Sequence, residues 1–299
     1  MKRLLFGADG FIGSSLHADV RVSRRDLDLT DYQAVQAFLT RHKPTHIISA
    51  ASKHGSFKEM QSGHHKFLRE NFLIDSNILE AASKCQVSNV SIISSISGLP
   101  ESDKQSSEKM ISMGPVADSN FGYNFSKYAA AQLVKSYQMD GFENFNCLLL
   151  GNVYGYNAKF IHNTNVVATL IKRMHEAMQL NEDLELYGNG LDARCFTHLV
   201  DIGNLIEKIV KSENKLLQPI IISESKAHTV RELAESISVS MNFKNRIKFL
   251  GIDQTSYTVK KIINTQLMEV VGAYKFIDLS EGIDQTVKCY LDAPDGKKL

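Results

Sequence analysis

A tyrosine and a lysine stand four residues apart, at Tyr123 and Lys127, well downstream of a glycine-rich run near the start of the chain. Residues at i and i+4 project from one face of a helix, so these two side chains can meet. An ammonium group beside a phenol favours the phenolate and eases proton transfer by the tyrosine. Such a pair also arises by chance on a protein surface. Its position between two predicted strands favours a catalytic pair.

The run Gly7-Ala8-Asp9-Gly10-Phe11-Ile12-Gly13 has the spacing of a loop that binds a dinucleotide. Glycines let the backbone turn tightly and approach a pyrophosphate, which rests at the N-terminus of the following helix. Here the run follows an apolar strand, and we expect it to open a helix over residues 12–17. An ordinary tight turn is the alternative. The residues predicted to contact the dinucleotide are Gly7, Gly10, Phe11, Ile12 and Gly13.

Arginines at the end of the second predicted strand bear on the choice of nicotinamide cofactor. A carboxylate there would accept from the ribose 2′-hydroxyl and repel a 2′-phosphate. The sequence instead has Arg24 and Arg25, whose guanidinium groups suit a phosphate in charge and in geometry. We therefore predict NADP(H), although the nearby Asp26 leaves NAD open. Asp28 and Leu29 are placed to meet the adenine.

Composition and cysteine usage set the broad class of protein. The chain has 299 residues, of which 43% are hydrophobic and 22% charged, as in an ordinary globular protein. Its formal net charge of +1 gives no reason to expect a nucleic-acid or membrane partner. The apolar start breaks at once into glycines, so we interpret it as a strand rather than a signal peptide. Because the four cysteines lack C-x-x-C or zinc-ligand spacing, we expect reduced thiols, no metal site and a cytoplasmic protein.

Strand-like and helix-like segments alternate along the first half of the chain. Strands are predicted at residues 2–6, 20–23, 45–50, 88–94 and 145–150, and helices at 32–41, 67–85 and 123–139. This alternation predicts an α/β fold, a Rossmann-like doubly wound parallel sheet. Beyond residue 151 it loosens, with helices at 166–180 and 230–241, and predicts a smaller C-terminal substrate-binding lobe. We expect residues 1–158 and about 191–224 to form the NADP(H)-binding domain, and about 159–190 and 225–299 the other lobe.

Three further stretches carry a family resemblance. They are Ala50-Ala51-Ser52-Lys53-His54-Gly55, Glu70-Asn71-Phe72 and Asn152-Val153-Tyr154-Gly155. With the arginine turn, they resemble the extended short-chain dehydrogenase/reductases, the NAD-dependent epimerase/dehydratase group, and within it most closely the GDP-L-fucose synthase family. The resemblance covers nearly the whole chain and implies an NADP-dependent oxidoreductase. It implies cofactor contacts from Ala50, Ala51, Lys53 and Lys127, and catalysis by Ser94, Tyr123 and Lys127, with Ser95 and Ser97 as rivals of Ser94.

The second half adds to this resemblance. The segment from Leu186 to Gly190, followed by Arg194, is similar to the family's V-W-G-S-G…R-E-F, in which the aromatic stacks on the nucleotide base and the arginine holds the diphosphate. The resemblance implies a GDP-linked keto-deoxy sugar as substrate, and a homodimer formed through the alanine-rich helix that carries Tyr123. The implied substrate contacts are Ser95, Asn152, Asn165, Arg173, Tyr187, Arg194 and Lys261. The aromatic and the cations among them could instead be solvated surface residues.

Two departures from the family pattern change the expected reaction. Ile96 replaces the cysteine that serves the family as a base for epimerisation, and Asn165 replaces its partner histidine. Neither side chain can carry a proton near neutral pH. No carboxylate follows Ser94, which argues against a dehydratase. We therefore expect a C4-ketoreductase of a GDP-4-keto-6-deoxy hexose or heptose, without C3/C5 epimerisation, in surface-polysaccharide sugar biosynthesis. A bifunctional 3,5-epimerase/4-reductase that uses His162, and a non-catalytic NADP-sensing protein, remain alternatives.

Overall fold

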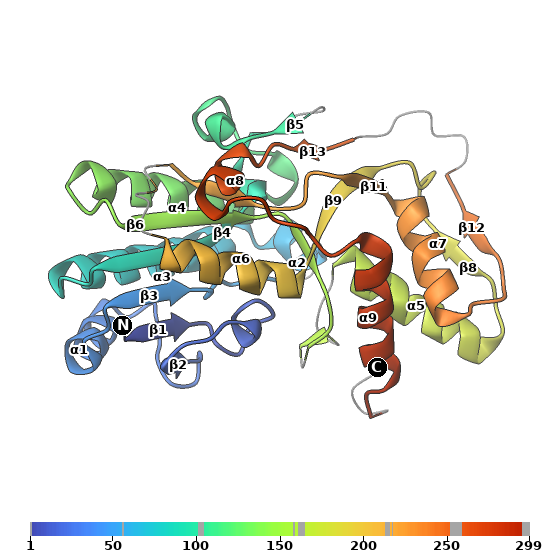
Figure 1. Ribbon diagram of the computed structural model, residues 1–299, viewed down its shortest axis with the longest axis horizontal. Coiled ribbons are helices and arrows are strands. Elements are labelled where there is room, and N and C mark those ends of the chain that lie inside the picture. Colours follow the sequence, from blue (N-terminus) through green and yellow to red (C-terminus); the bar gives the residue numbers. More distant parts are fainter. Residues whose placement is uncertain are drawn as a thin grey trace.

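The computed structural model describes residues 2–55, 57–100, 105–157, 159–160, 165–212, 216, 218–251 and 259–294. Figure 1 shows an α/β body that holds the N-terminus, and beside it a smaller lobe built from the second half of the chain. Within the described residues, no helix is long and apolar enough to cross a membrane.

Six parallel strands form the central sheet, in the order β10-β6-β4-β3-β1-β2. Most of their residues are apolar and buried, as expected for a parallel sheet with helices on both faces. This confirms the predicted doubly wound, Rossmann-like α/β fold. The strands are β1 (Arg3–Phe6), β2 (Val20–Val22), β3 (His46–Ser49), β4 (Asn89–Ser95), β6 (Phe145–Leu150) and β10 (Ile220–Ile222).

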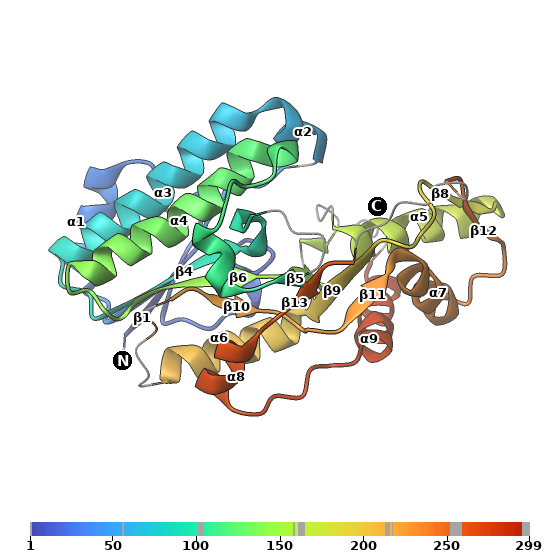
Figure 2. The ribbon, with the colours of Figure 1, turned by 90° about the horizontal axis from the view of Figure 1, so that it is seen from above.

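Helices cover the two faces of this sheet, and Figure 2 shows the three layers edge-on. Separate apolar clusters fill the space between the sheet and each helical layer. One face carries α1 (Tyr32–His42), α3 (His64–Lys84) and α4 (Phe121–Met139), with the short α2 (Phe57–Ser62) ahead of α3. The other face carries α6 (Leu199–Lys211) and α8 (Thr265–Val271). Four 3-10 helices lie in the connections: η1 (Gly13–Ser15), η2 (Ile96–Gly98), η3 (Glu108–Ser112) and η4 (Asp118–Asn120).

The helix expected over residues 12–17 is absent, and this prediction is wrong. Only η1, three residues long, follows the glycine loop. The reason lies in the short connection to β2. Asp19 already donates its backbone N–H to the carbonyl of Arg3, 3.0 Å away, and β2 begins at Val20. Three residues separate η1 from Asp19, too few for a further helical turn and a return to the sheet.

The strand order reverses at β1, because β2 and β3 lie on opposite sides of it. Open α/β sheets bind ligands outside the carboxyl ends of the strands at such a reversal. The ends of β1 and β3 also approach each other closely. A Cβ built on Gly7, which follows β1, would lie 2.6 Å from the carbonyl carbon of Ala50, which follows β3. The fold thus predicts a ligand site beside Gly7.

The smaller lobe has an apolar core of its own. Its helices are α5 (Val166–Leu180), α7 (Val230–Met241) and α9 (Leu279–Leu291), and the first two confirm the predicted helices at both ends. Its strands are β7 (Asn152–Tyr154), β9 (Ala193–His198) and β11 (Ala227–Thr229) in one sheet, and β8 (Leu184–Leu186) with β12 (Ile247–Phe249) in another. The numbered domain boundaries remain a prediction.

A small strand pair joins the two parts of the molecule. β5 (Gln105–Ser106), in the connection between β4 and α4, pairs in parallel with β13 (Lys261–Ile262). The residues just before β13 also run beside β9, through a bridge between Val259 and Ala193. The chain that leads into α4 is therefore hydrogen-bonded to the chain that returns from the smaller lobe.

Gly122 sets how closely α4 approaches α3. It is buried one residue before Tyr123, and a Cβ there would overlap the carbonyl group of His64. We expect Gly122→Ala to lower the free energy of unfolding by about 1–3 kcal/mol, because the helix start must move away from α3. Gly114→Ala is the control, since its Cβ would lie 3.7 Å from Pro100 in ordinary contact. Denaturant unfolding of both variants tests this, and equal effects would contradict it.

Candidate active site

A cavity of about 910 Å³ opens where the sheet order reverses. A volume of this size suits a cofactor or a similar small molecule. The predicted residues on its wall are Gly7, Gly10, Phe11, Ile12, Arg24, Asp28, Leu29, Ala50, Ala51, Lys53, Ser94, Ser95, Tyr123, Lys127 and Asn165. Most predicted cofactor and catalytic residues thus meet in one place, although they come from five separate stretches of the chain.

The glycine loop has the shape of a phosphate cradle. Gly7 has a φ of +74° and no space for a side chain, and a Cβ on Gly13 would overlap the carbonyl of Gly7. Among the described residues, no group accepts from the N–H of Phe11 or Ile12. Consecutive free N–H groups in a tight loop bind an anion, so the loop fits the pyrophosphate of a dinucleotide.

Asn157 fastens this loop from the smaller lobe's side. Its amide nitrogen donates to the carbonyl of Phe11 at 2.7 Å and to the hydroxyl oxygen of Ser14 at 2.9 Å. The sequence reasoning missed this residue. Its partners lie 146 and 143 positions away in the chain, so no local pattern could have shown the contact.

The turn after β2 keeps its two arginines at the surface. The side chain of Arg24 is 85% exposed, lines the cavity and lies 3.4 Å from the carboxylate of Glu70; Arg25 is exposed and lies outside the cavity wall. The carboxylate of Asp26 folds back and accepts from the N–H and hydroxyl of Ser23 at 2.8 and 2.7 Å, which lowers the pKa of Asp26. Asp26, the carboxylate that kept NAD possible as the cofactor, is thus already hydrogen-bonded within its own turn.

Tyr123 and Lys127 lie together in the cavity. The ammonium of Lys127 is 5.2 Å from the centre of the Tyr123 ring. Lys127 is only 3% exposed, and its Nζ donates to the hydroxyl of Ser52 at 2.8 Å. The Tyr123 hydroxyl has no protein partner within the described residues. A phenol that is open to a ligand, beside a buried positive charge, can act as a proton donor.

Behind Lys127, Asn71 of α3 joins the residues that follow β3 to α4. Its Oδ1 accepts from the Ser52 hydroxyl at 3.2 Å and from the Lys53 N–H at 2.6 Å, and its Nδ2 donates to the Ser126 hydroxyl at 3.3 Å. Asn71 is 1% exposed, so these bonds satisfy an amide that would be costly to bury alone. The ammonium, Ser52 and Asn71 thus form one connected polar network.

Asp75 lies one helical turn beyond Asn71 and is a second residue that the sequence reasoning missed. It is 4% exposed. Burial raises the pKa of its carboxyl to about 7, although the charge of Lys127 lowers it. A partly ionised carboxylate thus faces the same buried ammonium from α3. Its position four residues after Asn71 is the one sequence signal that could have pointed to it.

His54 is a third residue that was missed as a candidate. Its ring meets the Tyr123 ring edge-on, with centroids 5.3 Å apart and planes at 90°. It lines the cavity, and burial together with the charge of Lys127 lowers its pKa, so the imidazole is neutral at pH 7. A neutral imidazole can accept or relay a proton beside Tyr123.

Of the three serines, Ser94 supports α4 most directly. Its hydroxyl donates to the carbonyl of Lys127 at 3.1 Å and is 5% exposed. The hydroxyl oxygen of Ser95 accepts from the N–H of Ser97 at 3.2 Å and starts η2. Ser94 and Ser95 both line the cavity, whereas Ser97 does not.

The two residues that depart from the family pattern have structural roles. Ile96 packs against the core of the sheet and does not line the cavity. Asn165 caps α5, because its Oδ1 accepts from the N–H of Ala168 at 2.8 Å, and its Nδ2 donates to the carbonyl of Val153 at 2.9 Å. His162, the substitute considered for both, lies outside the described residues.

The remaining predicted substrate residues lie away from the cavity wall. Tyr187 is 87% exposed. Arg173 donates to the carbonyl of Glu185 at 2.5 Å, Arg194 to that of Ala193 at 2.8 Å, and Asn152 to that of Cys195 at 3.0 Å. Lys261 is exposed on β13. The structure thus brings together most of the cofactor and catalytic residues. The five substrate residues in this paragraph lie on the smaller lobe or where it joins the α/β body.

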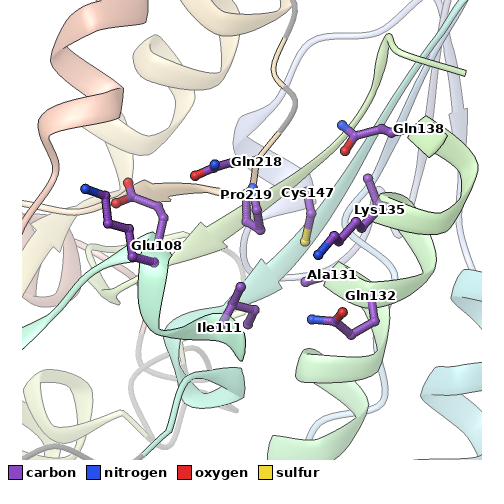
Figure 3. Close-up of a pocket in the computed structure, with 11 residues that line it drawn as sticks. Glu108, Ile111, Ala131, Gln132, Lys135, Gln138, Cys147, Gln218 and Pro219 are labelled. Atoms are coloured by element: carbon purple, nitrogen blue, oxygen red, sulfur yellow. The ribbon is translucent and has the colours of Figure 1, made fainter. Parts of the chain in front are cut away.

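A second cavity of about 310 Å³ lies beyond the site, between α4, η3 and the segment before β10 (Figure 3). Glu108 of η3 accepts from the N–H of Ile221 in β10 at 3.2 Å, and burial raises its pKa. Cys147 also lines this cavity, and burial raises the pKa of its thiol to about 12, so the thiol is protonated and unreactive. The contact of Glu108 fastens η3 to the edge of the sheet.

The pKa of Asp75 gives a test of its burial. A carboxyl whose folded pKa lies above its unfolded value stabilises the fold at low pH, and this contribution is lost as pH rises towards the folded pKa. From pH 4 to 8 the wild type should therefore lose up to about 4 kcal/mol of unfolding free energy relative to Asp75→Asn. Denaturant unfolding at several pH values measures the difference. Asp140→Asn, at an exposed carboxylate, is the control, and parallel curves for wild type and Asp75→Asn would contradict the assignment.

Comparison with known proteins places this site in a family. A family model described as the NAD dependent epimerase/dehydratase family matches residues 4–223. A probable GDP-L-fucose synthase from Drosophila melanogaster is 27% identical over 98% of this chain and 98% of that protein. A GDP-L-colitose synthase from Yersinia pseudotuberculosis has the same identity and coverage.

The solved structure of a GDP-mannoheptose C4 reductase from Campylobacter jejuni with NADP bound shares the fold, with a TM-score of 0.86 over 97% of this chain and 98% of that chain, at 19% identity. The family match spans the glycine loop and the Tyr123–Lys127 pair, and it confirms the resemblance found in the sequence. The chain belongs to the NAD dependent epimerase/dehydratase family.

Proposed function

We propose that this protein is an NADPH-dependent C4-ketoreductase of a GDP-linked 4-keto-6-deoxy sugar, a hexose or a heptose, and that it does not epimerise C3 or C5. The observation that carries the proposal is the open hydroxyl of Tyr123 beside the buried ammonium of Lys127, in the same cavity as the glycine loop. That arrangement suits reduction of a carbonyl next to a bound dinucleotide.

The cofactor assignment rests on the loop and on the arginine turn. The free N–H groups of Phe11 and Ile12 fit a pyrophosphate, and the exposed guanidinium groups of Arg24 and Arg25 suit a 2′-phosphate. Asp26, which could have accepted from a ribose hydroxyl, is bonded to Ser23 instead. The NADP in the Campylobacter reductase of the same fold supports this choice.

When bound, the nicotinamide supplies a hydride for C4 of the sugar. The hydroxyl of Tyr123 gives its proton to the C4 oxygen, and the nearby positive charge of Lys127 stabilises the phenolate that remains. Ser52 holds Lys127 in place, and the other N–H groups of the ammonium, which have no hydrogen-bond acceptor among the described residues, can bind ribose hydroxyls. Ser94 can polarise the sugar carbonyl if its hydroxyl turns from the carbonyl of Lys127 into the cavity.

The proposed absence of epimerisation rests on the two replaced residues. Ile96 has no group that carries a proton and packs against the core, and Asn165 is engaged as a helix cap, so neither can move a proton at C3 or C5. His54 is the observation that favours the bifunctional epimerase/reductase instead, because its neutral imidazole lies in the cavity. One imidazole beside Tyr123 does not supply both a base and an acid at two carbon centres.

The GDP-sugar is proposed from the relatives and from the smaller lobe. Two relatives of nearly equal length are named as GDP-L-fucose and GDP-L-colitose synthases. The exposed ring of Tyr187 could stack on a base, and the cations Arg173, Arg194 and Lys261 could hold a diphosphate. Products of this kind serve surface polysaccharides. A homodimer through α4 remains a prediction of the family resemblance.

Replacing the proposed acid should stop turnover and leave cofactor binding intact. We expect Tyr123→Phe to lower kcat by about 10²–10⁴-fold with an NADPH dissociation constant within about twofold of wild type, since one proton donor is lost. Tyr128→Phe is the matched control, because it makes the same change on α4 at a ring packed against the core. Turnover is followed by NADPH absorbance with GDP-4-keto-6-deoxymannose as substrate.

Near-normal turnover of Tyr123→Phe would show that Tyr123 is not the acid. A wild type that binds NADPH but reduces no nucleotide sugar would favour the NADP-sensing alternative.

The absence of epimerisation is tested in deuterated water. With keto-sugar nucleotide and NADPH, the product should carry no deuterium on C3 or C5 beyond that of an incubation without protein, as measured by NMR and mass spectrometry. Enzyme-dependent deuterium at either carbon would refute the reductase-only proposal. In that case His54→Gln would show whether His54 is the base.

A further inference from the structure

The glycine loop lacks the helix that ordinarily supports a bound pyrophosphate. A helix N-terminus offers a phosphate free N–H groups and roughly half a positive charge. Here one 3-10 turn, η1, follows the loop, and a turn of three residues has little dipole. Another group must therefore hold the loop in shape and offset the charge of the phosphates.

Arg21 occupies the place of the missing helix. From the middle of β2, its guanidinium donates to the carbonyl oxygens of Ala8 at 3.0 Å, of Gly13 at 3.1 Å, and of Leu16. In a continuous α-helix, the carbonyl of Gly13 would accept from the N–H of His17, four residues on. Since the chain leaves the helix before that point, the guanidinium takes the place of the second turn.

These contacts hold both ends of the loop at once. Ala8 lies before the free N–H groups of Phe11 and Ile12, and Gly13 and Leu16 lie after them. Arg21 is not part of the cavity wall, so it acts from behind the loop. A planar guanidinium holds these three carbonyls from two nitrogens in a fixed geometry, whereas a lysine has a single nitrogen on a flexible stem.

Helix α6 packs against the short segment that follows the glycine loop and covers its apolar side chain. Leu16 is 2% exposed and belongs to the same apolar cluster as Ile202 and Leu205 of α6. Gly203 of α6 lies against η1, where its Cβ would be 3.5 Å from the carbonyl oxygen of Ser15. α6 thus covers the apolar side of the shortened loop, while Arg21 serves its polar side.

We propose that Arg21 is the positioning residue of the pyrophosphate site. It holds the glycine loop so that the N–H groups of Phe11 and Ile12 face the phosphates, and it supplies the positive charge that a helix N-terminus would supply. This inference rests on the proposed dinucleotide binding. NADPH and NADH share the pyrophosphate, so Arg21 affects both equally, whereas Arg24 and Arg25 affect NADPH alone.

Calorimetric titration of the full chain with three ligands separates these roles. The ligands are NADPH, NADH and adenosine 2′-phosphate, which lacks the pyrophosphate. We expect Arg21→Ala to weaken NADPH and NADH by about the same factor, on the order of tenfold, and to leave adenosine 2′-phosphate within twofold of wild type. Arg24→Ala with Arg25→Ala should weaken NADPH and adenosine 2′-phosphate and spare NADH. Arg41→Ala, the same charge change on the exposed end of α1, should alter none of them.

A second variant distinguishes loss of the Arg21 contacts from misfolding of the protein. Arg21→Lys keeps the charge but has one donor nitrogen in place of the two that reach these carbonyls, so it should bind both dinucleotides with intermediate affinity. Hydrogen exchange of the segment around Phe11 and Ile12 should be faster than in wild type in both Arg21 variants, and NADPH should protect it less.

Three results would overturn the inference. Dinucleotide affinities of Arg21→Ala within twofold of wild type would show that the loop keeps its shape without Arg21. An equal loss for adenosine 2′-phosphate would show a general loss of structure rather than positioning of the loop. If the wild type itself binds neither NADPH nor NADH, the proposed function fails, and this inference fails with it.

Discussion

A buried ammonium is the constraint on which the rest of the site depends. Lys127 is 3% exposed, and an unpaired charge in that position would cost several kcal/mol. The fold surrounds it with groups that accept or balance the charge: the hydroxyl of Ser52, the amide of Asn71 behind it, and the carboxyl of Asp75. Because these groups come from the end of β3 and from α3, holding the charge also fixes both elements against α4.

The same constraint places the chemistry beside the cofactor site. Ser52 follows Ala50 and Ala51, whose backbone lies against Gly7. The segment Ala50–Ser52 therefore both packs against the glycine loop and accepts a hydrogen bond from the ammonium of Lys127. The hydroxyl of Tyr123, one helical turn from Lys127, is left open towards the cavity. The close approach of the residues that follow the neighbouring strands β1 and β3 thus positions both the phosphate cradle and the proton donor.

Local patterns in the sequence predicted the elements well and the tertiary contacts poorly. The helices at 166–180 and 230–241 are confirmed at both ends, because Asn165 and Thr229 cap their N-termini, and Asn181 and Asn242 end them in the left-handed conformation. The tyrosine–lysine pair and the glycine loop were found for the same reason, since each is a short spacing. Periodicity could not show that the first helix stops after Ser15, because that depends on where β2 begins to pair with β1.

Contacts between distant parts of the chain explain what was missed. Ser52 and Lys127 are 75 positions apart, and Phe11 and Asn157 are 146 apart, so no local pattern links them. The family motif over residues 50–55 includes His54 but assigns it no role. The fold brings its ring against that of Tyr123. The roles of Tyr187, Arg194, Arg173 and Lys261 rest on resemblance, because their positions on the smaller lobe do not by themselves define a ligand.

The pairing of β5 with β13 has a mechanical consequence. The backbone bonds between Gln105–Ser106 and Lys261–Ile262 cross from the connection that enters α4 to the strand that leaves the smaller lobe. A hinge movement of that lobe must either carry this connection along or break its two-residue ladder. A movement of the smaller lobe is in this way passed directly to the connection that enters α4, the helix that bears Tyr123.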